Sequence, residues 1–284
     1  MLGLNFLLVG CSLQITDNHG NTPLGLAARD GELALTQMLL RSPCIDVNCP
    51  NDHGISPLAH AATWGHTAIV RLLLEQDSIA VNSRDDKGDT PLACAAEEGH
   101  IGAVAALLEH EHVHADSRNC LEETPLALAA EGGHAVVVTM LLTRHDVDAN
   151  SVDATGCTPL IRASAMGYQD TVHLLVQHPG IDLNAQDRDG YTALAWAASR
   201  GHGAVIRLLM KQSGIEKDLL TTHGWSPLML ARVQEQWDNV KDLVGIRVPA
   251  SERGMGETEE EYVRLLPQGQ LRHGRARKVA TRVH

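Results

Sequence analysis

Histidine, cysteine and carboxylate side chains are the groups of this chain that could hold a metal or catalyse a reaction. The densest run is His110, His112 and His114, which alternate with Glu111 and Val113. In an extended segment the three imidazoles would face one side, as in a zinc ligand set. A zinc site also needs converging ligands and outer partners that orient them, and this run supplies neither. We therefore predict a solvated connector here, with no metal site and no bound cofactor.

The remaining histidines and the cysteines favour structural roles. Four histidines directly follow a glycine at one position of a repeating pattern: His66, His100, His134 and His202. Recurrence at one position predicts a structural role at the start of a helix. The six cysteines include no C-x-x-C pair, and the chain has no glycine-rich phosphate loop or nucleophile elbow. We predict no catalytic residue and no enzymatic activity.

A Thr/Ser-Pro-Leu step returns every 34 residues and defines the elements that position these side chains. It begins at residues 22, 56, 90, 124, 158 and 226, and Thr192-Ala193-Leu194 keeps the same register. Seven occurrences at one spacing predict a tandem array stacked as a solenoid.

Each unit is predicted to contain two helices and a loop. The Thr or Ser hydroxyl accepts a hydrogen bond from the first free N–H groups of a helix, and proline is tolerated directly after it. Glycines at residues 31, 65, 99, 133, 167 and 201 end this helix, because glycine adopts the left-handed conformation freely. A second, apolar helix follows. Residues 45–48 and 181–184 are predicted to be extended hairpin arms, with a glycine in the turn.

The order T-P-L, A-A, G-H, L-L resembles the ankyrin repeat over roughly residues 20–245. The resemblance implies an all-α solenoid of stacked helix-turn-helix units with protruding β-hairpin-like loops and a concave binding face. The histidine common after T-P-L is missing from every unit. The unit is also one residue longer than the usual 33, which is similar to arrays common in filamentous fungi.

Three regions are expected along the chain. Residues 1–19 resemble a partial N-terminal repeat, and residues 20–247 form seven units, the last a degenerate cap with a polar second helix. Residues 248–284 are expected to be a mostly disordered charged tail, with a short helix opening at residues 258–261. Residues 271–284 carry five cations and no acid.

Bulk composition bears on partners and compartment. A net charge of −12 and an aromatic content of 3% argue against nucleic-acid binding. The apolar stretch at residues 1–9 is too short to span a bilayer and lacks the features of a signal peptide. Cysteines without a disulfide pattern fit a reducing compartment. We expect an intracellular monomer, cytoplasmic or nuclear, without membrane contact.

The resemblance implies that hairpin tips and the exposed side of the first helix form the binding face. Residues 85–131 carry a net charge of −9, and apolar side chains, taken here as exposed, flank them. An acidic centre with apolar flanks suits a Lys/Arg-bearing peptide. The alternative is that the acids only keep the array soluble. The candidate partner-binding residues are Ile55, Trp64, Asp89, Glu97, Glu98, Glu123, Glu131, Met166, Tyr191, Arg200 and Trp225.

The function implied is that of a non-enzymatic protein-interaction scaffold or adaptor. A second interpretation is the recognition array of a larger protein or complex with catalytic activity, such as a ubiquitin-ligase adaptor or a signalling ATPase. A third is a nuclear regulator whose basic tail acts as an import signal. The basic tail also suggests that residues 271–284 compete with a basic ligand for the acidic groove.

Overall fold

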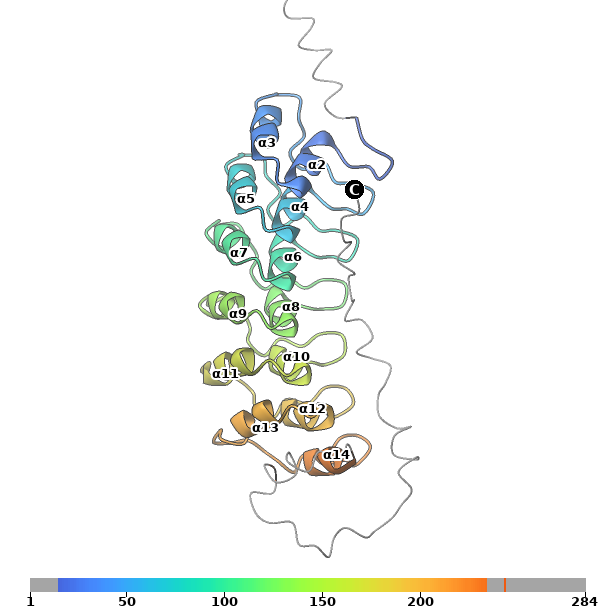
Figure 1. The fold of residues 1–284 in the computed structure, drawn as a ribbon, viewed down its shortest axis with the longest axis vertical. Coiled ribbons are helices and arrows are strands. Elements are labelled where there is room, and N and C mark those ends of the chain that lie inside the picture. Colours follow the sequence, from blue (N-terminus) through green and yellow to red (C-terminus); the bar gives the residue numbers. More distant parts are fainter. Residues whose placement is uncertain (1–14, 234–242, 244–284) are drawn as a thin grey trace, which may run out of the picture.

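A computed structural model describes residues 15–233 and residue 243 of the chain (Figure 1). The start of the partial first repeat, the second helix of the predicted cap and the charged tail lie outside the described residues. Within the described part the chain forms thirteen helices and no strand, which confirms the all-α solenoid. The helices are α2 (Pro23–Asp30), α3 (Leu33–Leu40), α4 (Pro57–Thr63), α5 (Thr67–Leu74), α6 (Pro91–Glu97), α7 (Ile101–Leu108), α8 (Pro125–Gly132), α9 (Ala135–Leu142), α10 (Pro159–Met166), α11 (Gln169–Gln177), α12 (Ala193–Arg200), α13 (Gly203–Leu209) and α14 (Pro227–Val233).

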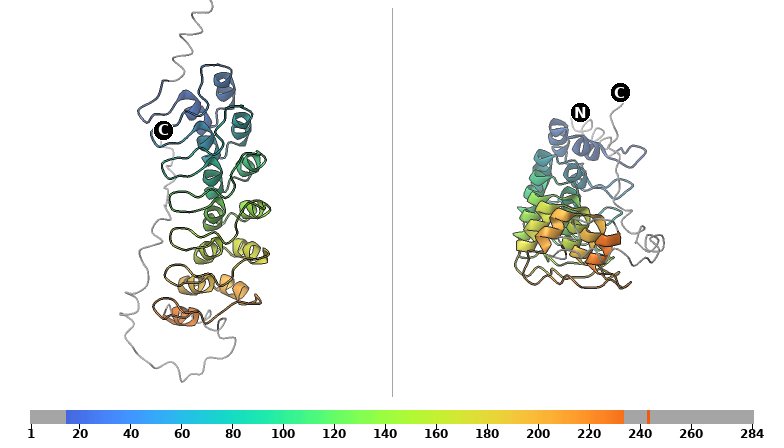
Figure 2. Two further views of the ribbon diagram at one scale, coloured as in Figure 1. Left: turned by 180° about the vertical axis from the view of Figure 1, so that it is seen from behind. Right: turned by 60° about the horizontal axis from the view of Figure 1, so that its bottom comes forward.

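The helices stand in two parallel columns (Figures 1 and 2). The even-numbered helices, called inner helices here, each open a unit and pack against the inner helices of the neighbouring units. The odd-numbered helices, called outer helices, form the second column. Loops that lead from each outer helix to the next inner helix project on the side of the inner column. Each unit therefore touches mainly the unit before it and the unit after it.

The inner helices begin and end where the sequence predicts. In every unit the hydroxyl of the capping Thr or Ser accepts a hydrogen bond from the N–H three residues later, at 3.0–3.3 Å. Thr192 caps α12 although alanine replaces the usual proline after it. The glycines that follow the inner helices all have φ between 70° and 82°. These two signals set the length of each inner helix at seven or eight residues.

The core is a row of leucines between the two columns. The leucine of the Thr/Ser-Pro-Leu step is at most 1% exposed in the six units from Leu24 to Leu194. Burying each such side chain stabilises the fold by about 1.5–3 kcal/mol. The alanine pairs, such as Ala61 and Ala62, are fully buried as well, and their small size lets neighbouring inner helices approach closely.

The four repeated histidines are structural, as the sequence predicts, but each one joins two units instead of starting a helix. Each occupies the residue before an outer helix without making a capping bond. Instead its Nε2–H donates to a carbonyl 37 residues earlier, at 2.9–3.0 Å. The ring covers the helix-ending glycine of the preceding unit. A Cβ added at Gly99, for example, would lie 2.3 Å from Nδ1 of His134.

The extended arms predicted at residues 45–48 and 181–184 are wrong, because both segments contain turns. An aspartate side chain competes with an extended backbone here: Asp46 Oδ1 accepts the N–H of Asn48 at 3.0 Å, and Asp182 Oδ1 accepts that of Asn184 at 2.9 Å. The turn directs the asparagine side chain to the next unit. The Asn48 amide donates to the Ser78 carbonyl at 2.7 Å, and its Oδ1 accepts the next unit's N–H at 2.8 Å.

The same two bonds recur at Asn82, Asn150 and Asn184, but Asp116 occupies this position in the unit between them. The Asp116 carboxylate accepts the backbone N–H of Asp148, yet its Oδ1 is buried without a partner. Burial raises the pKa of Asp116, and the hydrogen bond from the Asp148 N–H lowers it. The negative charges of Asp148 and Asp146 raise this pKa further, whereas the positive charge of Arg118 lowers it. A carboxylate has no N–H for the carbonyl of the following unit, so this junction lacks one bond.

Replacing Asp116 with Asn should stabilise the protein by about 1 kcal/mol at pH 7, because the amide supplies the missing donor. The pKa of Asp116 is raised in the folded state, so the unfavourable charge is present at neutral pH and disappears as the pH falls. The gain should therefore shrink towards pH 4 in urea unfolding experiments. The reverse change, Asn82→Asp, should destabilise the neighbouring junction. Equal stability of wild type and Asp116→Asn at pH 7 would contradict the missing-bond explanation.

Candidate partner-binding surface

The predicted partner-binding residues separate by exposure into three groups. Four are exposed, namely Trp64, Glu98, Met166 and Arg200. Four are partly exposed, namely Ile55, Glu97, Glu131 and Trp225. Three are buried, namely Asp89, Glu123 and Tyr191. All four exposed residues occupy one register position, at or just after the C-terminal end of an inner helix, so they form a row along the stack.

Tyr191 is not the exposed anchor that the sequence suggests, and Asp89 does not reach the surface. Their exposed fractions are 4% and 3%. Successive loops stack directly, as in the bond from the N–H of Asp86 to the carbonyl of His53 at 3.0 Å. The residue before the capping Thr or Ser is therefore buried in five of the seven units, whereas Ile55 and Trp225 remain partly exposed. The Tyr191 ring packs on Trp196, with ring centroids 4.7 Å apart.

Asp89 is a buried carboxylate with limited compensation. The Asn119 amide donates to its Oδ1 at 2.8 Å. Burial nevertheless raises the pKa of Asp89 to about 6, and the charges of Asp85 and Glu97 add to the shift. Near neutral pH this position therefore holds a destabilising negative charge beside Glu97.

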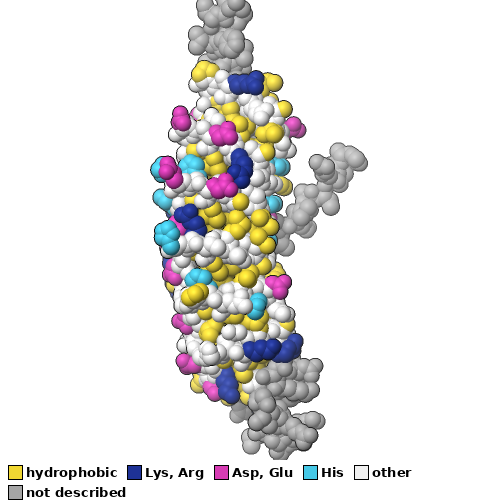
Figure 3. Space-filling model, turned by 90° about the vertical axis from the view of Figure 1, so that its left-hand side faces the viewer, with side chains coloured by type: hydrophobic (Ala, Val, Ile, Leu, Met, Phe, Trp, Pro, Cys, Tyr) yellow, Lys and Arg dark blue, Asp and Glu magenta, His cyan; other side chains and the backbone are white. Residues whose placement is uncertain are grey.

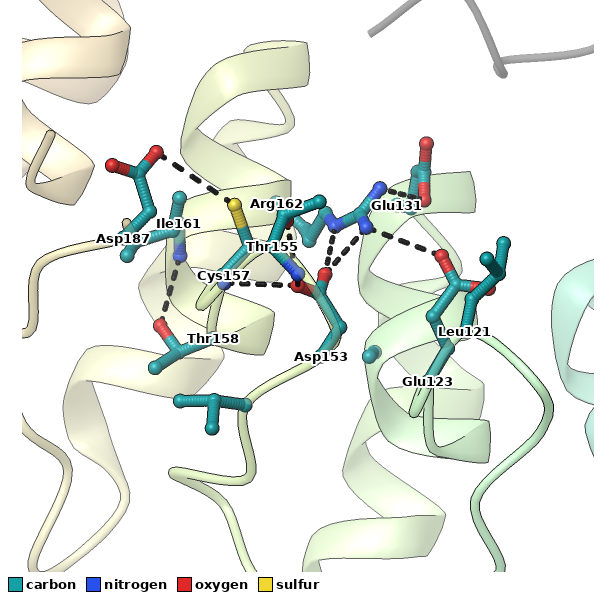
Figure 4. Close-up of polar contacts among 12 residues, drawn as sticks. Leu121, Glu123, Glu131, Asp153, Thr155, Cys157, Thr158, Ile161, Arg162 and Asp187 are labelled. Carbon is teal, nitrogen blue, oxygen red and sulfur yellow. Dashed lines mark hydrogen bonds and ion pairs between the residues drawn. The ribbon is translucent and has the colours of Figure 1, made fainter. Parts of the chain in front are cut away.

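Arg162 binds two acids of the fourth unit and one acid of its own unit, a cluster that was not predicted from the sequence. It extends from α10 towards the preceding unit, where Nη1 bonds Glu131 at 2.8 Å and Nη2 bonds Glu123 at 3.1 Å (Figure 4). Its Nε and Nη2 also bond Asp153, whose side chain is fully buried. The Arg162 side chain is itself only 12% exposed. We call these four residues the Arg162 cluster.

The cluster remains acidic despite its arginine. Three carboxylates share one guanidinium, which leaves two negative charges when all are ionised. Burial alone would lower the pKa of Arg162, but the charges of Glu131 and Asp153 outweigh it and raise the pKa, so the guanidinium stays charged. Burial raises the pKa of Glu131, and Arg162 opposes that shift. The acidic groove predicted from the sequence is thus partly neutralised from within.

One signal in the sequence could have revealed this cluster. Arg162 occupies the second position after the Thr/Ser-Pro-Leu step, where the other units have residues such as Cys94, Leu128 and Trp196. An arginine in a largely apolar inner row, one unit beyond Glu131, needs a buried anionic partner.

The apolar side chains exposed on the outer helices were not predicted from the sequence either. Figure 3 shows them along the middle of that face, and Met38, Ile101 and Val136 are 67%, 48% and 52% exposed.

The histidine run at residues 110–114 lies on an exposed connector. The rings of His110 and His112 meet edge to face, with centroids 5.7 Å apart, and the N–H of His114 is held by Asn82. Within residues 15–233, no three His, Cys, Asp or Glu side chains are grouped so that they could hold a metal ion.

The fold and this surface define a class: a helical repeat solenoid that presents a row of side chains at the ends of its inner helices. A family model described as ankyrin repeats (three copies) matches residues 3–85, 35–116, 110–187 and 179–251. The chain therefore belongs to the ankyrin-repeat family, whose repeats are protein–protein interaction modules. A search of curated proteins found no match.

Two solved structures are similar over most of the chain. The ankyrin repeat domain of Bcl-3, described as a unique member of the IkappaB protein family, is 29% identical with a TM-score of 0.68. That match covers 80% of this chain and 100% of the other. The ankyrin repeat domain of human ASB11 is 26% identical with a TM-score of 0.69, and the match covers 81% and 99% of the two chains.

Changing Arg162 to Gln should destabilise the protein by about 3 kcal/mol or more at pH 7, because it leaves three carboxylates without their cation. The loss should become smaller as the pH falls and these carboxylates become protonated. Urea unfolding monitored by circular dichroism measures it. Arg71→Gln is the matched control, since it breaks an exposed pair with Glu109 and should change stability little. Similar losses in both variants would contradict the role assigned to Arg162.

Changing Asp89 to Asn should stabilise the protein at pH 7 by roughly 3 kcal/mol, given about 1.4 kcal/mol per pKa unit. The pKa of Asp89 is about 6 in the folded state and 3.8 ordinarily, so the stability penalty grows as the pH rises between these values. The gain should be near zero below pH 4 and constant above pH 7. The exposed change Asp86→Asn is the control, and it should not produce the same gain at pH 7 in the same unfolding series.

Proposed function

We propose that the chain is a non-enzymatic scaffold or adaptor that binds a protein partner along the ends of its inner helices. The observation that carries the proposal is the row of exposed side chains there, in which Trp64 and Met166 flank Glu98. Exposed aromatic and methionine side chains are enriched at contact sites between proteins. An acidic centre between apolar flanks suits a partner segment that carries Lys or Arg.

The acids that serve this proposal are fewer than the sequence suggests. Glu123 and Asp89 are buried, so they act on a ligand through their charge. Glu97, Glu98 and Glu131 retain exposed surface, and we call these three the acidic surface. The sign of the field there supports a cationic partner and disfavours nucleic acid.

The environment of the thiols supports a non-catalytic role. Burial raises the pKa of Cys94 and of Cys157 to about 12, so neither is a thiolate nucleophile near neutral pH. Among the described residues, Cys49, Cys94, Cys120 and Cys157 form no disulfide bond, which supports a reducing, intracellular setting. In the described part of the chain, every helix is too short or too polar to cross a membrane. We propose that the protein acts as a monomer in the cytoplasm or nucleus.

The recognition array of a larger protein or complex is the second candidate. It is supported by the similar structures, both of which are described as the ankyrin repeat domain of a named protein. Transcripts that extend the reading frame upstream of Met1 would favour it over the scaffold.

Reversing the charge of Glu97 and Glu98 to Lys should remove basic partners that the wild-type chain captures from cell extract. Glu123 and Glu131 are left unchanged, because both bond Arg162 and their loss would confound binding with unfolding. The control is Glu75→Lys with Glu111→Lys, which makes the same charge change at exposed sites away from the inner helices. Captured proteins are compared by mass spectrometry. Identical captures from all three forms would mean that the acidic surface is not where the partner binds.

A further inference from the structure

The Arg162 cluster, to which Glu131 of the acidic surface belongs, carries more negative charge than its one arginine neutralises. Arg162 is the single cation bonded to Glu123, Glu131 and Asp153 in the described part of the chain. Burial raises the pKa of Glu131, and the charge of Arg162 lowers it. The negative charge of nearby Glu97 raises the pKa of Glu131 further. A second cation beside Glu97 and Glu131 would reduce this repulsion.

The way in which Arg162 is held indicates which cation fits. Its planar guanidinium reaches Glu131 through Nη1 and Glu123 through Nη2, so one group serves carboxylates from two parts of the neighbouring unit (Figure 4). The fork geometry of arginine allows this, whereas the lysine ammonium is a point charge. An arginine-rich ligand therefore suits the adjacent carboxylates best.

Trp64 adds a second element that recognises arginine. Trp64 directly follows α4 and holds the same position in its unit that Glu98 holds in the next one. The Trp64 side chain is 59% exposed. A guanidinium that stacks on its ring could bond Glu98 as well, and both contacts favour arginine. The chain already contains such a stack, since the Arg200 guanidinium lies 5.6 Å from the centre of the Trp196 ring.

The chain has a segment with the matching chemistry. Residues 271–284 contain no acid and five cations, four of which are arginines: Arg272, Arg275, Arg277, Lys278 and Arg282. Five steps of roughly 8–10 Å between packed inner helices separate α14 from α4, so the distance to bridge to Trp64 is about 40–50 Å. The 38 residues from Val233 to Leu271 would span about 57 Å even as a continuous helix, and more if extended.

We propose that residues 271–284 dock on the acidic surface, with an arginine on Trp64 and others on Glu97, Glu98 and Glu131. The inference rests on the proposed function, because the segment would bind the same surface as the partner. The segment is a ligand that every copy of the chain carries. An external basic partner then has to displace this segment. The tethered segment acts at a high effective concentration, so a modest intrinsic affinity suffices.

A labelled peptide of residues 271–284 tests this in fluorescence anisotropy titrations. The receptor is the full-length chain with Arg272, Arg275, Arg277, Lys278 and Arg282 changed to Gln, called the tail-neutral chain. Binding should be saturable at low salt and weaken as salt screens the charges. Adding Glu97→Gln and Glu98→Gln should weaken binding by about fivefold or more. The control changes Glu75→Gln and Glu111→Gln, which remove the same charge elsewhere, should leave the affinity unchanged.

The wild-type chain should bind the added peptide about fivefold more weakly than the tail-neutral chain, because its own segment occupies the surface. Equal affinity of the two chains, or equal losses in the two pairs of Gln changes, would overturn the proposal. An unrelated arginine-rich peptide of the same net charge separates the two inferences. If it binds through Glu97 and Glu98 but residues 271–284 do not, the basic-partner surface stands and the internal ligand is rejected. If neither peptide binds, both are rejected.

Discussion

The structure depends on a contact between a glycine without a side chain and an imidazole from the next unit. The six inner helices from α2 to α12 end at a glycine with positive φ. At five of these glycines, from Gly31 to Gly167, a ring of the following unit covers the space where a Cβ would lie. In four junctions the ring Nε2–H also satisfies a carbonyl at the end of that helix. At Gly133 the ring is Tyr168, which keeps the packing. A residue inserted between the glycine and the ring that covers it would move the ring away from the glycine. This contact therefore requires the same spacing of 34 residues in every unit.

Because the framework repeats, the positions that break the pattern carry the specific information. Arg162 in an apolar row collects carboxylates from its own and the preceding unit, and Asp116 interrupts a row of asparagines. Glu122 is a third example, since it has a φ of 60° where the other units have a turn glycine. All three substitutions lie in or beside the acidic third and fourth units. An array whose sequence served stability alone would use the residue of the other units at each of them.

Charge and stability oppose each other in this region. Asp89 and Glu131 are held where burial raises the pKa of both, so each costs folding free energy when it is ionised. Arg162 offsets part of the cost for Glu131 only. The surplus acids face a row that also exposes Trp64 and Met166, and a cationic ligand would stabilise the array as it binds. Under the proposed function, binding and folding are therefore coupled at the same residues.

The sequence alone determined the family, the helix pairs and the caps, because glycine, proline and Thr/Ser act through local backbone geometry that recurs every 34 residues. It also assigned the repeated histidines to a structural role. It did not determine which polar side chains reach the surface. Tyr191 and Asp89 are buried because successive loops stack, and Arg162 meets Glu123 and Glu131 across a junction between units. Exposure and ion pairing depend on contacts over 30 or more residues, so only the tertiary structure decided them.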